Sequence, residues 1–243
     1  MKYVGSKAGI IRHIAPIIHN SLSTGNGAYV EPFVGGGNSI VRINANKRIG
    51  ADANRYVISL LSELRDGWIP PDISREEYTD IRDHKDSYDD HLVGWAGVGC
   101  SYSGKWFGGY AGLVKTRDGI RDYISEARRN VLAQAPLLTG VDLRHCDYEN
   151  LSIQDGSVIY CDPPYANTLK YPGEFDTRKF WLWCEDMSRF NSVLVSEYEA
   201  PEGWSTLWHG MRGSSLSANG SVGGHKMCVE KLYCRLPKRK VRS

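Results

Sequence analysis

The sequence predicts an α/β fold with a mostly parallel sheet and an antiparallel hairpin at one edge. Three observations lead to this prediction. Short apolar runs typical of buried strands alternate with helical patterns along most of the chain. Two of these runs end in a glycine loop and in an acid followed by two prolines, which suits a sheet whose strand ends face a ligand. The last two strand-like runs follow each other with no helix between them, which favours an antiparallel pair.

The composition is that of an ordinary globular protein. The chain has 243 residues, of which 41% are hydrophobic and 24% are charged. No apolar run reaches the roughly 18 residues of a membrane span, so we expect no membrane partner. Arg12, His13 and Pro16 interrupt the apolar N-terminal stretch, which argues against a signal peptide. Six cysteines without a C-x-x-C pair predict a reducing, cytoplasmic location and no structural metal.

The net charge of +2 is too small for a general polycation. Binding to nucleic acid would therefore depend on local basic patches. One candidate is the C-terminal tail, residues 237–243, which is either a solubilising end or a phosphate contact.

The first third of the chain predicts two helices and two strands. Apolar residues at three- and four-residue spacing predict a helix over 7–22, with Pro16 causing a kink or a later start. A short buried strand then leads into the glycine loop, and we expect a helix from about Asn38. Residues 48–54 read as a second strand, and Asn54 opens a helix with an apolar face.

The pattern changes after Asp66. Ser74 and Glu77 form a capping box for a short charged helix. Residues 94–112 contain seven glycines and five aromatics, and read as neither a helix nor an ordinary strand. An amphipathic helix is expected from about Gly119, with Ile120 on its apolar face. We therefore predict one catalytic domain, residues 1–66 and 119–243, interrupted by an insertion at 67–118.

The remaining elements restore the alternation. Strands are predicted at 141–148 and 157–162, a helix at 177–190 and a strand at 192–197. Runs at 204–210 and 226–236 form the closing hairpin, joined by the glycine- and serine-rich segment 212–225.

The glycine loop favours a nucleoside ligand. Glycines after a strand let a ligand approach the backbone closely. Asp52 lies seventeen positions after Gly35, at the end of the next strand, where a carboxylate can accept hydrogen bonds from ribose hydroxyls. The loop alone is as compatible with a plain tight turn. A dinucleotide is disfavoured because Ile40 stands where the fingerprint needs glycine, so S-adenosylmethionine, which has no phosphate, fits better.

The segment CDPPY, residues 161–165, suits the binding of an amino group. Asp162 stands at a strand tip, and Pro163 and Pro164 fix the backbone without donating hydrogen bonds. The carboxylate and the Pro163 carbonyl can accept both hydrogens of one amine, and Tyr165 offers a stacking face. A base presented in this way must be flipped out of a duplex. The alternative is a simple strand-ending turn in which Asp162 acts as a cap.

With these motifs, the sequence resembles the Dam-like DNA adenine-N6 methyltransferases, in particular the compact forms of phages and prophages. KYVGSK at residues 2–7, EPFVGGG at 31–37, ADAN at 51–54 and CDPPY resemble the family's motifs in the order of its alpha group. The resemblance implies a Rossmann-like methyltransferase sheet, S-adenosyl-L-methionine as cofactor and adenine in double-stranded DNA as the target. It implies no metal and no obligate protein partner.

The resemblance also implies roles for particular residues. The catalytic motif comprises Asp162, Pro163, Pro164 and Tyr165. The cofactor would be bound by Tyr3, Lys7, Pro32, Phe33, Gly35, Gly37, Asp52, Asp147, Tyr148 and Asp162. The insertion would recognise DNA through Tyr102, Lys105, Trp106, Phe107, Tyr110, Lys115 and Arg117. The other interpretation of these aromatics, a glycine-rich loop packing on the main domain, stays open beside it.

Two other functions remain to be weighed. An enzyme that methylates cytosine-N4, RNA or protein glutamine is disfavoured, because such enzymes tend to carry Asn or Ser at the position of Asp162. A non-catalytic DNA-binding module would be expected to have a broken cofactor site, and here the matching positions are intact.

Overall fold

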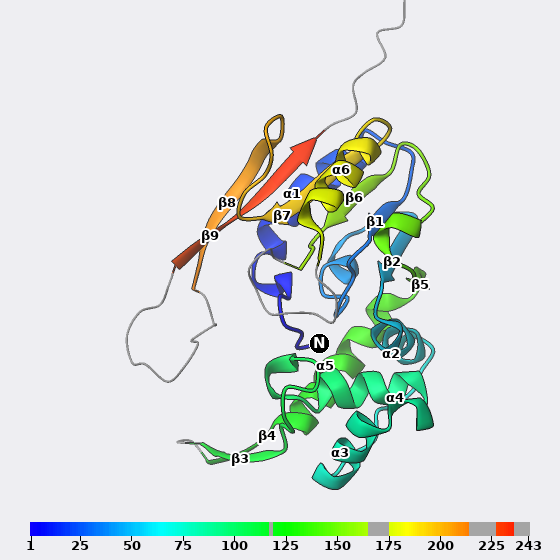
Figure 1. The fold of residues 1–243 in the computed structure, drawn as a ribbon, viewed down its shortest axis with the longest axis vertical. Helices are drawn as coiled ribbons and strands as arrows, with labels where there is room; N and C mark the ends of the chain where they lie inside the picture. The colour runs from blue at the N-terminus through cyan, green and yellow to red at the C-terminus, as the bar shows by residue number, and fades with distance from the viewer. Residues whose placement is uncertain (117–118, 165–174, 214–226, 236–243) are drawn as a thin grey trace, which may run out of the picture. The chain divides into compact units, whose positions relative to one another are not determined.

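The structure is a computed structural model that describes residues 1–116, 119–164, 175–213 and 227–235 (Figure 1). Contacts divide the chain into two compact units. Unit 1 comprises Met1–Arg12 and Pro32–Leu151, and unit 2 comprises His13–Glu31 and Ser152–Ser243. Tyr165, Arg117, most of the 212–225 segment and the basic tail lie outside the described residues.

Seven strands form the main sheet. They are β1 (Tyr29–Glu31), β2 (Arg48–Asp52), β5 (Val141–His145), β6 (Val158–Cys161), β7 (Ser192–Glu197), β8 (Ser205–Gly213) and β9 (Met227–Arg235). Their order is β5-β2-β1-β6-β7-β9-β8. The β2/β5, β1/β6 and β6/β7 pairs are parallel, whereas β9 runs antiparallel to both β7 and β8. The predicted α/β class, with its mostly parallel Rossmann-like sheet and closing hairpin, is confirmed.

Apolar strands and two helices supply the buried residues of unit 2. All four residues of β6 are buried, and five of the six residues of β7 are buried. Helix α1 (Ile11–Leu22) contains Pro16 and buries Ile14 and Ile18. It starts later than predicted, because Lys7–Gly9 is a separate 3-10 turn. Asp176 caps α6 (Thr177–Met187) by accepting a hydrogen bond from the Lys179 amide at 2.9 Å.

Two helices of unit 1, α2 and α3, begin where their capping residues predict. Asn54 caps α2 (Arg55–Arg65), and its side chain accepts a hydrogen bond from the Tyr56 amide at 3.1 Å. Ser74 and Glu77 form the predicted capping box of α3 (Arg75–Asp83). The other helical segments are η2 (Ile40–Arg42), η3 (Lys85–Ser87), α4 (Asp90–Gly94), the π-helix η4 (Trp95–Gly99), η5 (Tyr102–Gly104), α5 (Tyr123–Gln134), η6 (Ala135–Leu138) and η7 (Tyr148–Asn150).

One apolar core joins the helices of unit 1. It includes Leu60 and Leu64 of α2, Tyr78 and Ile81 of α3, Trp95 of η4, and Ile124, Ala127 and Val131 of α5. Its members come from both sides of the predicted insertion boundaries at residues 67 and 118. The division into a catalytic domain and an insertion stays a prediction; the contacts group residues 32–151 together.

Three local predictions were wrong. The helix expected from Asn38 is only the short η2, because the β-branched residues at 40, 41 and 43 and the asparagines at 44 and 46 are poor helix formers. The helix expected from Gly119 begins at Tyr123, because Asp122 caps it and the preceding residues form the hairpin β3 (Leu113–Thr116) with β4 (Gly119–Asp122). Residues 95–99 are helical after all, as a π-helix.

Candidate active site

Asp52 closes the glycine loop in unit 1. Its carboxylate follows the buried centre of β2, and Oδ2 accepts a hydrogen bond from the Gly35 amide at 3.0 Å. Its Oδ1 accepts one from the Asn54 amide at 2.9 Å. One side chain thus joins the loop after β1 to the first turn of α2. Asp52 therefore lies at the end of β2, where the sequence placed it, and its role toward a ribose stays a prediction.

Tyr3 packs directly against the loop, and only glycine leaves room for it. A Cβ atom on Gly35 would lie 2.8 Å from Cε1 of Tyr3, and one on Gly36 would lie 2.7 Å from its Cβ. Gly35 and Gly37 also have positive φ angles of +46° and +68°, which L side chains rarely adopt. The glycines are therefore required both by backbone conformation and by the approach of Tyr3.

The environment of Asp52 leaves it able to accept further hydrogen bonds. Burial raises the pKa of this carboxyl, and the amides of Asn54 and Gly35 oppose that shift. Each carboxylate oxygen has two lone pairs, and the backbone contacts given above use one on each. The lone pairs that remain on the two oxygens can accept hydrogen bonds from two hydroxyls on neighbouring carbons, as in a ribose.

An aromatic pair of the same unit lies just after the ends of β1 and β5. The rings of Phe33 and Tyr148 are 5.3 Å apart between centroids and tilted by 35°. Asp147 caps η7 by accepting a hydrogen bond from the Glu149 amide at 3.0 Å, which fixes the start of the turn that carries Tyr148. Pro32 and Tyr148 are buried, and Phe33 is half-buried. These rings offer an apolar surface of the kind on which a nucleobase packs.

Two further polar side chains of this unit are buried. Lys7 donates a hydrogen bond to the Gly5 carbonyl at 3.3 Å, within the N-terminal segment. Gln134 of α5 is also buried, and its Nε2 donates to the Gly36 carbonyl at 2.8 Å. Gln134 was not predicted, because nothing in the local sequence of α5 distinguishes this residue from others on the helix.

In unit 2, Asp162 directly follows the last buried residue of β6. It is half-buried, and Pro163 beside it is buried. Glu31 at the end of the neighbouring strand β1 is also buried and accepts a hydrogen bond from the Tyr29 hydroxyl at 2.7 Å. Burial, with a smaller contribution from the charge of Asp162, raises the pKa of Glu31 to about 8. Sequence reasoning missed Glu31, although it is an acid at a strand tip like Asp162.

The predicted DNA-binding residues fall into two groups. Trp106 stacks on Tyr56 with ring centroids 5.6 Å apart, and the Tyr110 hydroxyl donates to the Ile73 carbonyl at 2.7 Å. Trp106 thus contacts a residue of the predicted catalytic domain, whereas Tyr110 contacts one of the predicted insertion, and whether either ring binds DNA stays a prediction. Tyr102, by contrast, is 64% exposed, and Lys105 and Lys115 are exposed as well.

The described residues contain neither a cluster of metal ligands nor a membrane-spanning helix. Within the described ranges, no three or more His, Cys, Asp or Glu side chains gather as metal ligands do. No helix among those residues is both long and apolar enough to cross a membrane. Cys100, Cys161, Cys184 and Cys234 are buried free thiols, the state of a cysteine that packs as a small hydrophobe.

Known proteins resemble the chain in part. Residues 3–92 match the family described as D12 class N6 adenine-specific DNA methyltransferase, which confirms the predicted resemblance over those residues. The Type II methyltransferase M.FokI of Planomicrobium okeanokoites is 34% identical over 65 residues, which are 27% of this chain and 9% of that protein. The crystal structure of SMU.472 in complex with SAH aligns with a TM-score of 0.39 and 14% identity, covering 96% of this chain and 54% of that one. The chain therefore spans only part of the length of both proteins.

Proposed function

We propose that this chain, which matches the D12 class N6 adenine-specific DNA methyltransferases over residues 3–92, is a site-specific DNA methyltransferase. It transfers a methyl group from S-adenosyl-L-methionine to the exocyclic N6 amine of a flipped-out adenine in duplex DNA. The observation that carries the proposal is the glycine loop closed by Asp52, which lies inside the matched segment. Action in the cytoplasm without an obligate protein partner is part of the same proposal.

The residues of unit 1 would hold the nucleoside part of the cofactor. Asp52 would accept hydrogen bonds from the ribose hydroxyls, with its remaining lone pairs. Phe33, Asp147 and Tyr148 would bind the adenine. Tyr3, Lys7, Pro32, Gly35 and Gly37 would shape the rest of the pocket. When bound, the cofactor supplies an electrophilic methyl group on a sulfonium sulfur.

Asp162 and its neighbours would position the target amine. The amine nitrogen is a poor nucleophile, because its lone pair is delocalised into the base. If the Asp162 carboxylate and the Pro163 carbonyl each accept one N–H, the lone pair is localised and directed at the methyl carbon. The new N–C bond forms as the C–S bond breaks, its electron pair stays on sulfur, and the amine then loses one proton to solvent. Pro164 would hold the backbone, and Tyr165 would stack on the base.

DNA would be held by the exposed residues of the segment 94–122. Lys105 and Lys115 are free to approach phosphates, and Tyr102 is exposed enough to stack on a base. The other predicted contacts, from Trp106, Tyr110 and Arg117, stay part of the proposal. For Trp106 and Tyr110, a DNA contact would have to use the ring edges left open by their packing.

The proposal is tested by transfer of a tritiated methyl group from S-adenosylmethionine to unmethylated duplex DNA. We expect transfer by the wild type and a loss of about 100-fold or more with Asp162→Ala, because the positioned acceptor is removed. Asp155→Ala replaces an exposed aspartate of the same unit and should leave the rate unchanged.

Digestion of the product to nucleosides and mass spectrometry identify the modified base. N6-methyladenine supports the proposal, whereas N4-methylcytosine would replace it by the alternative enzyme class. Folded protein that binds the cofactor but methylates no DNA would refute it. Long-read sequencing of DNA from cells that express the chain would give the recognition sequence.

A further inference from the structure

A cluster of charges surrounds the ring of Tyr123 at the start of α5. Arg121 donates two hydrogen bonds to Glu126, from Nε to Oε1 at 2.5 Å and from Nη2 to Oε2 at 2.8 Å. Lys2 Nζ lies 3.5 Å from the same Oε2. The Arg121 guanidinium and the Lys2 ammonium also lie over the Tyr123 ring, 4.8 Å and 5.1 Å from its centroid. We refer to Lys2, Arg121, Tyr123 and Glu126 as the Glu126 cluster.

The cluster holds more positive than negative charge. Lys2 and Arg121 share the single carboxylate of Glu126. With both cations protonated, the net charge of the cluster is +1. The hydrogen bonds from Arg121, together with the nearby charge of Lys2, lower the pKa of Glu126 to about 2. Glu126 therefore stays ionised under physiological conditions. Its carboxylate presents a negative charge and two acceptor oxygens to an arginine fork and a lysine, which are also the features by which a phosphate is bound.

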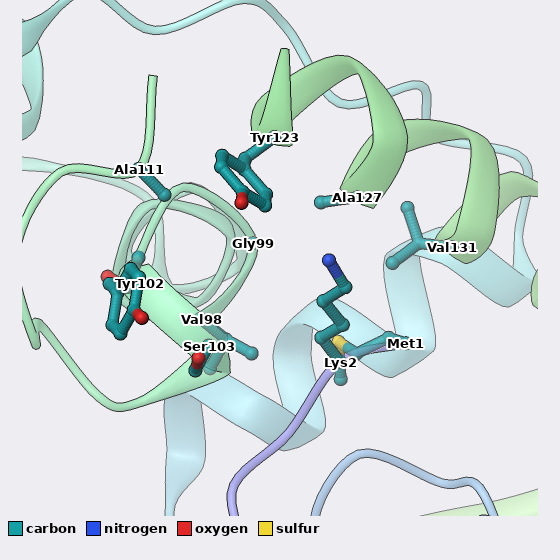
Figure 2. A pocket seen from close by; sticks show the side chains of 11 residues that line it. Met1, Lys2, Val98, Gly99, Tyr102, Ser103, Ala111, Tyr123, Ala127 and Val131 are labelled. Atoms are coloured by element: carbon teal, nitrogen blue, oxygen red, sulfur yellow. The ribbon is translucent and has the colours of Figure 1, made fainter. Parts of the chain in front are cut away.

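A small cavity opens beside the cluster. Its volume is about 200 Å³, and Lys2, Val98, Tyr102 and Tyr123 are among the residues that line it (Figure 2). Close packing holds Lys2 here, since a Cβ on Gly104 would lie 2.5 Å from the Lys2 carbonyl oxygen. Arg121 and the exposed Lys115 both belong to the hairpin β3–β4, which ends at Asp122. The cavity, the exposed Tyr102 and the basic hairpin therefore adjoin the cluster.

From this arrangement we infer that Glu126 is an internal competitor for a backbone phosphate of DNA. On this inference, Lys2 and Arg121 form a phosphate site that Glu126 fills in the free protein. A DNA phosphate displaces the Glu126 carboxylate and binds the same two cations. The inference rests on the proposed function only in taking DNA as the ligand, and no bond is made or broken.

An ordinary surface ion pair differs from this cluster. Isolated exposed pairs contribute little, typically up to about 1 kcal/mol, and need not face a ligand. The pair Arg144–Asp142 is of that kind: Nη2 lies 2.6 Å from Oδ2, and Lys47 and Arg65 act on this carboxylate through their charge alone, with no salt bridge to it among those of the described residues. It offers a matched control in the same unit, because Asp142→Asn removes the same charge from an arginine partner.

The test measures affinity for short unmethylated duplexes of randomised sequence as a function of salt. Glu126→Gln should tighten binding about 3- to 10-fold at low salt and steepen the fall of affinity with salt, because the two cations become fully available to phosphate. Arg121→Ala and Lys2→Ala should each weaken binding and reduce the salt slope by about 1. Asp142→Asn should behave as the wild type, which excludes a general effect of net charge.

Other outcomes separate the two proposals. If the wild type binds and methylates DNA but Glu126→Gln and Arg121→Ala leave both affinity and slope unchanged, the inference is wrong and the proposed function stands. If the wild type binds no DNA in the presence of S-adenosylhomocysteine, the proposed function fails as well. Thermal unfolding of each variant identifies any that lose affinity through misfolding, and Arg121→Lys, which keeps the charge, should then retain most of the salt slope.

Discussion

At Glu31, burial outweighs the hydrogen bond that favours the charged form. The Tyr29 hydroxyl stabilises the carboxylate, yet removal from water dominates and the pKa is raised to about 8. Asp52 shows the same conflict, but there two backbone amides oppose the effect of burial. The position of Asp52 at the end of β2 was predictable, because its spacing from Gly35 places it at the end of the next strand. Glu31 was not predicted, because the function of the segment EPFVGGG was assigned to its glycines and not to the acid at its start.

The raised pKa predicts how stability depends on pH. Because native Glu31 holds its proton more tightly than an unfolded glutamate, its contribution is complete below about pH 4.5 and is lost as pH rises to about 8. Within that window the wild type should lose up to about 1.4 kcal/mol of unfolding free energy per pH unit from this group.

Glu31→Gln keeps an acceptor for Tyr29 but cannot ionise. Urea unfolding across the same pH window should therefore show a flatter dependence for this variant than for the wild type. Equal slopes for the two proteins would mean that Glu31 is already ionised in the native state.

At the scale of elements, α4 and α2 approach each other through a glycine. A Cβ on Gly94 would lie 2.3 Å from the Tyr56 carbonyl oxygen and 3.0 Å from the Cβ of Leu60. Capping residues made α2 and α3 predictable, because a side chain that bonds the first turn is a local signal. The start of α5 was not, since Ile120 fits a helical spacing but lies on β4 and is 76% exposed.

Gly94→Ala should destabilise the protein by about 1–3 kcal/mol, because the backbone of α2 cannot yield to the added methyl group. Denaturant unfolding of the variant gives this value. Gly9→Ala is the matched control: no atom lies within 4 Å of the added Cβ, and the change should stay within about 0.5 kcal/mol. Equal stability of Gly94→Ala and wild type would show that the two helices can separate without cost.

At the scale of the whole chain, the mostly parallel sheet and the hairpin at its edge were predictable from the alternation of short patterns, whereas the strand order was not predicted. The division of the chain into two units by contacts was not predictable from these patterns, because the core that joins α2, α3, η4 and α5 forms between residues far apart in sequence. The same holds for the Glu126 cluster, whose members come from the N-terminus, a hairpin and a helix. Local patterns carry no information about such long-range packing.

A bound cofactor should stabilise the fold. With free S-adenosylhomocysteine at about 100 times its Kd, the unfolding free energy should rise by about 2.7 kcal/mol. Asp52→Asn should lose most of this gain, because an amide cannot accept hydrogen bonds at both positions that face Gly35 and Asn54. Differential scanning fluorimetry and calorimetry measure both quantities.

The control for this prediction is Asn54→Ala. It removes the cap of α2, at a cost of about 1 kcal/mol, but keeps the backbone amide that Asp52 accepts from. The gain from S-adenosylhomocysteine should therefore remain. A gain in Asp52→Asn as large as that of the wild type would exclude Asp52 from the binding site.

The hydrogen bonds that join Asp52 to the glycine loop and to Asn54 should affect the rate at which a ligand binds. Because Gly35, Asn54 and Tyr3 already hold the loop in place, it is preorganised, and no conformational entropy has to be lost there when a ligand arrives. Association should then follow a single step, without the slow phase of a loop that closes after encounter. Affinity differences among variants that keep the loop preorganised should then appear mainly in the dissociation rate.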